Sequence, residues 1–206
     1  MRDDGGVNRI VSGEAGGTKL RVPKKGTRPT TELVREALFN ILEVEGDLDG
    51  VRVLDLYSGS GGLGLEALSR GAGGVLFVEA DRAAAEVLRG NISNVGLGGA
   101  VRQRPVLDVL RAGSSEPMDL VLVDPPYALE ETELTDVLAT LAPRGWVCDG
   151  SLVVVERHRR NGPPQWPERF EVLRDRRYGQ NVLYRAEYRP GDRDDDGSSA
   201  TTTMPG

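Results

Sequence analysis

The chain has one cysteine, one histidine and few aromatic residues, and each shortage excludes a class of function. Cys148 stands alone, so no intrachain disulfide can form and a zinc site built on cysteines is excluded. His158 is the single histidine, so metal centres built on several imidazoles are excluded, as is any Ser-His triad without His158. No Gly-Lys-Ser or Gly-Lys-Thr triplet occurs, which argues against an NTP-hydrolysing phosphate loop.

Long apolar runs are also missing. No stretch approaches the 18 or so residues of a membrane helix, and the first ten residues lack the apolar centre of a signal peptide. Hydrophobic residues make up 38% and charged residues 28% of the 206, which predicts one globular domain with a real core. A cytoplasmic protein that binds no membrane and no metal is therefore expected.

Charge is distributed unevenly along the chain. The net charge of −6 argues against a general nucleic-acid binder. However, residues 9–35 and 157–189 each carry a net charge of +5, whereas residues 36–156 between them carry −12. The two basic segments could be ordinary solvated surface, or they could form one surface that faces phosphates.

The pattern of apolar residues predicts three regions. Residues 1–30 comprise a disordered start and an N-terminal β-hairpin, residues 31–189 form the main domain, and residues 190–206 form a disordered acidic tail. In the main domain the expected strands are 51–57, 74–80, 100–106, 119–124, 151–157 and an antiparallel pair over 169–189; the expected helices are 31–46, 62–71, 81–96, 106–113 and 130–143. This alternation predicts an α/β, Rossmann-like fold, with a mostly parallel seven-stranded sheet and an antiparallel edge.

A glycine-rich loop follows the first of these strands. Asp55 ends the strand, and Gly59, Gly61 and Gly64 then satisfy the spacing of a nucleotide-binding loop before a helix. Glu79 ends the next strand twenty residues after Gly59, where a carboxylate can accept both hydroxyls of an adenosine ribose. Asp81 is interpreted as a helix cap. The combination predicts a nucleoside-cofactor site but does not distinguish a dinucleotide from S-adenosylmethionine.

The strand "DLVLVD" ends in Asp124-Pro125-Pro126-Tyr127. Two consecutive prolines fix a stiff corner that presents the Asp124 carboxylate and the Pro125 carbonyl together. Two adjacent acceptors suit an exocyclic –NH2 of a base, and Tyr127 offers a face for stacking. This motif predicts methyl transfer to an amine, with S-adenosylmethionine as cofactor. A nicotinamide dehydrogenase transfers hydride and does not need a pair of acceptors for an amine.

Taken together, these motifs resemble the class I S-adenosylmethionine-dependent methyltransferases, and more narrowly the RsmD-type 16S rRNA guanine-N2 methyltransferases. The likeness covers residues 9–188, and "RPTTELVREALFNIL" before the first strand is its most specific part. The resemblance implies methyl transfer to N2 of guanine-966 of 16S rRNA, in a small-subunit (30S) assembly particle. Separately, the protein is expected to be a monomer. It makes the catalytic loop Asp124, Pro125, Pro126 and Tyr127.

The same resemblance assigns the cofactor contacts to Asp55, Gly59, Gly61 and Glu79, and it assigns the substrate side to Arg9, Lys19, Arg21, Arg28, Thr30 and Arg35. This chain departs from the pattern after the third strand, where Pro105 replaces the expected acid or amide that reads adenine. Backbone groups near Val106 are expected to read adenine instead, with Asp108 as an alternative.

Several residues receive no firm functional assignment. Arg157, Arg159 and Arg160 could line the RNA face or could simply be solvated, and Trp146 and Trp166 are interpreted as packing residues; Cys148 and His158 receive no role. Three other functions remain open: a DNA adenine-N6 methyltransferase, an RNA chaperone without turnover, and a nicotinamide oxidoreductase.

Overall fold

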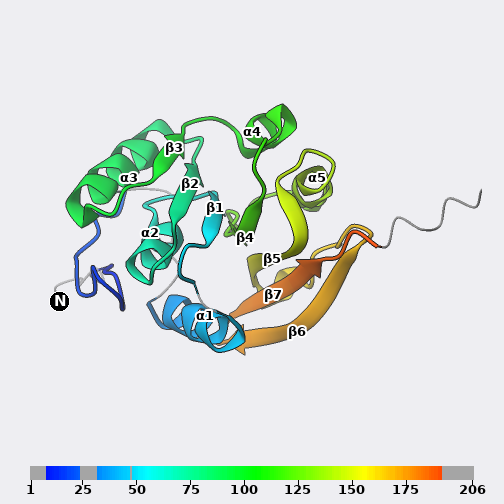
Figure 1. Ribbon diagram of the computed structural model, residues 1–206, viewed down its shortest axis with the longest axis horizontal. Helices are drawn as coiled ribbons and strands as arrows, with labels where there is room; N and C mark the ends of the chain where they lie inside the picture. Colours follow the sequence, from blue (N-terminus) through cyan, green and yellow to red (C-terminus); the bar gives the residue numbers. More distant parts are fainter. Residues whose placement is uncertain (1–7, 24–31, 47, 192–206) are drawn as a thin grey trace, which may run out of the picture.

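The computed structural model describes residues 8–23, 32–46 and 48–191. In chain order its elements are α1 (Glu32–Glu45), β1 (Arg52–Leu56), α2 (Gly62–Ser69), β2 (Gly74–Val78), α3 (Arg82–Val95), β3 (Ala100–Arg102), α4 (Val106–Ala112), β4 (Met118–Val123), α5 (Glu131–Leu141), β5 (Val147–His158), the 3-10 turn η1 (Arg159–Asn161), β6 (Phe170–Tyr178) and β7 (Asn181–Tyr188). Figure 1 shows the sheet running through the middle of the molecule with helices on both sides.

Seven strands form one sheet in the order β3-β2-β1-β4-β5-β7-β6. The first five of these run parallel, and β7 pairs antiparallel with both β5 and β6. The order reverses between β1 and β4, and in open parallel sheets ligands bind outside the carboxyl ends of the strands at such a reversal. The predicted Rossmann-like fold with an antiparallel edge is confirmed.

Each face of the sheet buries its own apolar core. On one face, side chains from α1, α2 and α3 such as Phe39, Leu65 and Leu88 pack against alternate strand residues. On the other face, α4 and α5 supply Leu110 and Leu138. Strands covered on both faces must be apolar at nearly every position, which explains the continuous apolar runs seen in the sequence.

Residues 8–23 pack directly onto the main domain. The predicted hairpin is reduced to one antiparallel bridge between Arg9 and Lys19. Ile10 and Leu20 are 0% and 5% exposed and belong to the core under α1, α2 and α3. The segment is therefore part of the same core, because its two apolar runs have no partner of their own to bury against.

Other boundaries also differ from the expected ones. The third strand was expected to reach residue 106, but Pro105 caps α4 and Val106 is its first residue. Proline lacks an N–H and so fits a helix start, where that N–H would have no intrahelical partner. The fifth strand extends over twelve residues, well beyond the expected 151–157. A disordered start and a disordered tail over 190–206 were expected, and of these residues 1–7 and 192–206 lie outside the described residues.

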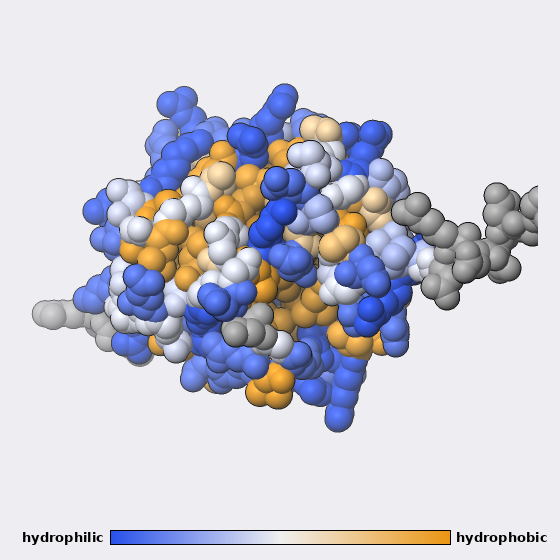
Figure 2. Space-filling view, in the orientation of Figure 1, coloured by the Kyte–Doolittle hydropathy of each residue, from blue (hydrophilic) through white to orange (hydrophobic). Residues whose placement is uncertain are grey.

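Figure 2 shows that hydrophilic residues dominate the rim of the molecule in the view of Figure 1, while apolar residues lie mainly toward the middle. Among the residues that the structure describes, no helix is both long and apolar enough to cross a membrane.

Candidate active site

Four acids lie at the carboxyl ends of neighbouring parallel strands. Asp55 lies on β1, Glu79 directly follows β2, Asp124 directly follows β4, and Glu156 lies near the end of β5. All four line one cavity of about 470 Å³. Its size falls within the usual range for small-molecule sites, and its place at the reversal of strand order is where such sites form.

The glycine loop after β1 forms one wall of this cavity. Gly61 begins α2 with a φ of 87°, and a Cβ on it would lie 2.4 Å from a Leu88 methyl carbon. A Cβ on Gly64 would lie 2.3 Å from the Phe77 ring. Only glycine satisfies both positions, because the turn needs positive φ and α2 must approach β2 closely.

Glu79 is held in place by the same loop. One of its carboxylate oxygens accepts a hydrogen bond from the Gly59 N–H at 2.8 Å, and the other accepts from the Asp81 N–H at 2.7 Å. Asp81 in turn caps α3 by accepting from the Ala84 N–H, which confirms the predicted cap. Glu79 therefore lies fixed beside the glycine loop at the cavity wall, as a residue that binds a ribose would need to lie.

Asp55 is almost fully buried beneath the loop. It is 1% exposed, and its carboxylate accepts a hydrogen bond from the Gly64 N–H at 3.0 Å. Burial raises the pKa of Asp55 to about 8; the Gly64 hydrogen bond opposes this, and the charges of Asp124 and Glu79 add to it. The cavity therefore concentrates negative charge in a poorly solvated place, which favours a cationic ligand.

The Asp124-Pro125-Pro126-Tyr127 loop forms the wall nearest β5. The Asp124 N–H still joins the sheet by donating to the Leu56 carbonyl at 3.4 Å, and the chain then leaves the sheet at Pro125. The Tyr127 ring is 48% exposed and packs edge-on against His158, with ring centroids 5.9 Å apart. Tyr127 thus lines the cavity together with Asp124.

Arg35 lies inside the protein and lines the cavity from α1. Its side chain is 0% exposed and forms an ion pair with Glu66 of α2, at 3.4 Å from Nε to the carboxylate. Its guanidinium also donates to the Asn8 side-chain oxygen at 2.9 Å and to the Arg9 carbonyl. Arg35 therefore joins the N-terminal segment, α1 and α2.

Asn8 is oriented by that contact. Because its amide oxygen accepts from Arg35, its –NH2 group must point the other way, and this buried nitrogen has no hydrogen-bond partner among the described residues. Asn8 and Arg35 both line the cavity. This end of the cavity thus offers a donor and a cation, whereas its other walls offer acceptors.

Val106 and Asp108 were the two candidates expected near the adenine of a cofactor. Pro105 and Val106 both line the cavity, whereas Asp108 is exposed and is not among the lining residues. The structure thus brings the expected Val106 to the site and leaves the alternative, Asp108, outside it.

Sequence reasoning missed several polar residues of the lining, among them Asn8, Tyr57, Glu133, Glu156 and Asn181. Glu156 carried a usable signal, because "LVVVE" is an apolar strand ending in an acid, like "VLD", "FVE" and "LVD". Asn181 carried none, since its place in the cavity depends on the antiparallel register of β7 with β5.

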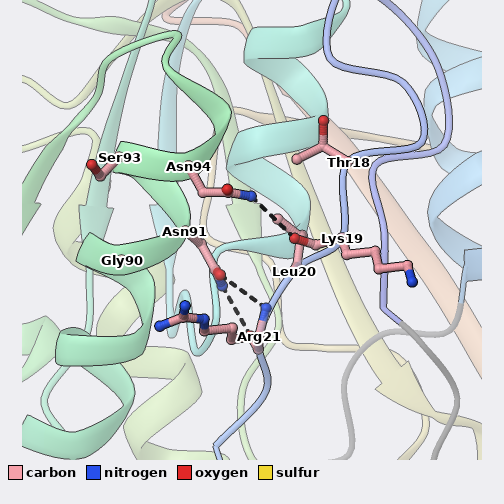
Figure 3. Close-up of a pocket in the computed structure, with 8 residues that line it drawn as sticks. All are labelled: Thr18, Lys19, Leu20, Arg21, Gly90, Asn91, Ser93 and Asn94. Carbon is pink, nitrogen blue, oxygen red and sulfur yellow. Dashed lines mark hydrogen bonds between the residues drawn. The ribbon is translucent and has the colours of Figure 1, made fainter.

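Two of the predicted substrate residues line a second, open groove. Thr18 to Arg21 run along α3, and the groove between them has a volume of about 780 Å³ (Figure 3). Asn91 fixes the Arg21 backbone by bonds of 2.9 Å in both directions, and Asn94 donates to the Lys19 carbonyl at 3.3 Å. These bonds hold the backbone of Lys19 and Arg21 against α3, while the side chains of both residues are exposed.

The remaining predicted residues are distributed as follows. Arg9 is exposed and forms an ion pair with Glu32 at 3.4 Å. Arg28 and Thr30 lie outside the described residues. Arg157 was expected either to face RNA or to be solvated, and both are wrong, since it is 7% exposed and pairs with Glu131. Arg159 and Arg160 are exposed.

Both tryptophans pack, as predicted. Trp146 is 4% exposed and donates to the Leu110 carbonyl at 2.9 Å, and Trp166 stacks on Phe170 with ring centroids 6.0 Å apart. Among the described residues, no three His, Cys, Asp or Glu side chains are grouped so as to hold a metal ion.

The fold and the cavity together are those of a class I methyltransferase. The strand order with an antiparallel β7, the glycine loop, a fixed carboxylate after β2 and an acid-lined cavity suit a cationic nucleoside cofactor. S-Adenosylmethionine fits this arrangement, since it combines a ribose with a positively charged sulfonium.

Comparison with known proteins supports this assignment to the methyltransferases. The family model described as "Conserved hypothetical protein 95" matches residues 8–187. The chain is 39% identical over 184 residues to the Ribosomal RNA small subunit methyltransferase D of Escherichia coli, covering 87% of this chain and 89% of that protein. It is 32% identical over 176 residues to the Putative rRNA methyltransferase YlbH of Bacillus subtilis, covering 83% of this chain and 94% of that one.

Solved structures show the same likeness. The putative methyltransferase yhhF from E. coli has a TM-score of 0.79 and 34% identity, covering 90% of this chain and 100% of that one. An RNA methyltransferase from Salinibacter ruber, at 18% identity and a TM-score of 0.61, shares the fold. The chain belongs to the RsmD family of class I S-adenosylmethionine-dependent methyltransferases.

Proposed function

We propose that this methyltransferase acts on the exocyclic N2 of a guanine in 16S rRNA, of the guanine-966 type, within an assembling small ribosomal subunit. The observation that carries the proposal is the Asp124-Pro125-Pro126-Tyr127 loop, which lines the same cavity as the glycine loop and Glu79. The identity of 39% to an enzyme named for the small-subunit rRNA supports the choice of RNA.

The loop solves a specific chemical problem. An exocyclic amine of a base is a poor nucleophile because its lone pair is delocalised into the ring. We propose that the Asp124 carboxylate and the Pro125 carbonyl accept the two amine hydrogens, which localises the lone pair on nitrogen. As the new C–N bond forms, Asp124 is placed to take up the proton that the nitrogen loses. The cofactor, when bound, supplies an electrophilic methyl group and leaves as the neutral thioether.

The residues that would hold the cofactor follow the strand order. We propose that Val106, after β3, contacts the adenine and that Glu79, after β2, binds the ribose, while Asp55, Gly59 and Gly61 hold the rest of the cofactor. Of these residues, Val106, Glu79, Asp55 and Gly59 line the cavity. The donors of Asn8 and Arg35 lie at the far end, where they suit the carboxylate of the methionyl group.

The charge of the cavity limits what else can enter. Six acids line it, namely Asp55, Glu79, Asp81, Asp124, Glu133 and Glu156, against one arginine. A phosphate would be repelled there, whereas a neutral base that donates hydrogen bonds would be accepted. The base must therefore be extruded from its stack while its backbone remains outside, and Tyr127 offers it a stacking face.

We propose that the RNA backbone follows the basic surface of residues 9–35. Lys19 and Arg21 project from the groove beside α3 (Figure 3). Arg9 is exposed and pairs with Lys19 through an antiparallel bridge. Arg28 and Thr30 are proposed to contact the substrate as well, and Arg35 acts from inside the cavity wall. The enzyme is proposed to work as a cytoplasmic monomer on the particle, with 16S rRNA as its partner.

The test is transfer of a labelled methyl group to small subunits from a strain that lacks the gene. We expect label in N2-methylguanosine after nucleoside digestion of the 16S rRNA, at one nucleotide, and none in duplex DNA. Label only in N6-methyladenine of DNA would replace this proposal with the DNA alternative. Calorimetry that showed NAD bound and S-adenosylmethionine ignored would overturn it altogether.

A further inference from the structure

The Asp-Pro-Pro-Tyr loop explains why an exocyclic amine is the target, but both guanine and adenine carry one. Their Watson–Crick edges differ beside that amine: guanine presents the N1–H donor next to its N2 amine, whereas adenine presents an N1 acceptor next to its N6 amine. A residue that discriminates between them must lie beside Asp124 and must be an acceptor that cannot donate.

Glu156 meets that requirement by its position in the sheet. The parallel register pairs Val123 of β4 with Val155 of β5, so Asp124 and Glu156 follow at matched positions on adjacent strands. Leu122 and Val154, two residues earlier, face the core under α1 and α2, and side chains alternate along a strand. Asp124 and Glu156 therefore extend from the same face of the sheet, on neighbouring strands about 5 Å apart.

The order of the strands places Glu156 on the side of the base. The proposed cofactor residues lie over β3, β2 and β1, Asp124 lies next over β4, and Glu156 lies beyond it over β5. A base whose amine reaches Asp124 from the side opposite the cofactor must lie over β5.

The Glu156 carboxylate is also held rigidly. The residue is 7% exposed, and one of its oxygens accepts a hydrogen bond of 2.7 Å from the Asn181 amide on β7. An ionised carboxylate has about four acceptor positions, so this bond leaves capacity for a base. Asn181 itself lines the cavity, and β5 and β7 pair through His158 and Asn181 at this end of the sheet.

We infer that Glu156 is the residue that selects guanine, by accepting the N1–H of the target base while Asp124 and Pro125 hold its N2 amine. Asn181 is the positioning residue that aims the carboxylate. An adenine would place its N1 lone pair against this buried carboxylate and would leave the acid unsatisfied, which a site of this kind rejects strongly. The inference rests on the proposed function, because it assumes that a base enters this cavity.

The experiment uses two target bases that share the 2-amine. Small subunits are reconstituted on 16S rRNA that carries either guanosine or 2-aminopurine riboside at the nucleotide that the wild-type enzyme methylates. 2-Aminopurine keeps the amine but presents an N1 acceptor. Wild-type enzyme should transfer methyl to guanosine roughly 100-fold faster or more, since each bidentate base contact provides about a 10- to 100-fold preference.

The informative variant is Glu156→Gln, which keeps the shape and the acceptor for Asn181 but can donate to an N1 acceptor. We expect transfer to guanosine to fall roughly 10- to 100-fold, and transfer to 2-aminopurine to stay level or rise. The guanosine preference should therefore shrink by at least roughly 10- to 100-fold. Glu187→Gln, the same change on β7 but outside the cavity lining, is the matched control and should keep the wild-type preference.

A preference that stays within about threefold of wild type in Glu156→Gln would overturn the inference. Loss of transfer to both bases by a folded variant would overturn it as well, because glutamine satisfies 2-aminopurine. Both results leave the proposed function intact, provided that wild-type enzyme labels guanosine. Wild-type enzyme that labels no guanosine refutes the proposed function itself, so the two failures are distinguishable.

Discussion

Asp55 should make the protein less stable as the pH rises, and Asp55→Asn should remove that dependence. The carboxylate is 1% exposed, and burial raises its pKa to about 8, far above its usual value of 3.8. The folded protein therefore holds a proton on Asp55 between pH 4 and 8 that the unfolded chain releases. The free energy of unfolding is then highest below pH 4, falls as the pH rises, and levels off above pH 8.

The size of the effect follows from the width of that window. Each unit of pKa shift corresponds to about 1.4 kcal/mol, so a window of roughly four units corresponds to stability on the order of 5 kcal/mol. Asparagine keeps an oxygen that can accept from the Gly64 N–H, but it carries no charge. Asp55→Asn should thus match wild type near pH 4 and exceed it by several kcal/mol near pH 8.

The assay is urea unfolding of the cofactor-free protein at pH values from 4 to 9, followed by circular dichroism. Asp119→Asn is the matched control, because Asp119 is exposed and also accepts a backbone N–H, that of Arg52 at 2.8 Å. Parallel stability profiles for wild type and Asp55→Asn would refute the reasoning. Above pH 8, where Asp55 is ionised, the same variant should bind S-adenosylmethionine about tenfold more weakly or worse than wild type, since an anion beside a cation is lost.

Three further predictions concern other parts of the site. Asp124→Asn should lower methyl transfer by about 100-fold or more while calorimetry shows nearly unchanged cofactor binding; equal losses of both would contradict the assigned role. Gly64→Ala should destabilise the fold by about 1–3 kcal/mol in urea unfolding, because its Cβ would lie 2.3 Å from the Phe77 ring; an unchanged midpoint would show that α2 can shift. The double change Lys19→Gln and Arg21→Gln should weaken RNA binding and reduce the slope of log affinity against log salt by roughly 1.5; an unchanged slope would place the RNA elsewhere.

The fold could be predicted because both faces of the sheet are covered. Strands such as "VVV" within β5 and "LVLV" within β4 must be apolar throughout. An acid then marks the carboxyl end of the apolar run in β1, β2 and β4. The same reasoning located Asp55, Glu79 and Asp124 from the sequence. Their meeting in one cavity follows from parallel strands ending at the same edge.

What could not be predicted depends on pairing between distant segments. Arg35 was expected beside the substrate from the family resemblance alone, and its burial depends on Glu66 and Asn8, which are far from it in sequence. Ile10 and Leu20 looked like a separate hairpin because periodicity does not show which core an apolar residue joins. Asn181 enters the cavity only through the register of β7 with β5.

The proposed methylation of the N2 amine of guanine in the small-subunit rRNA can be measured on the product itself. Unmethylated small subunits are incubated with the purified enzyme and S-adenosylmethionine, and the modified nucleosides of their 16S rRNA are identified by mass spectrometry. We expect one N2-methylguanosine per rRNA with wild-type enzyme and almost none with Asp124→Asn. A methyl group found on adenosine, or equal methylation by both enzymes, would contradict it.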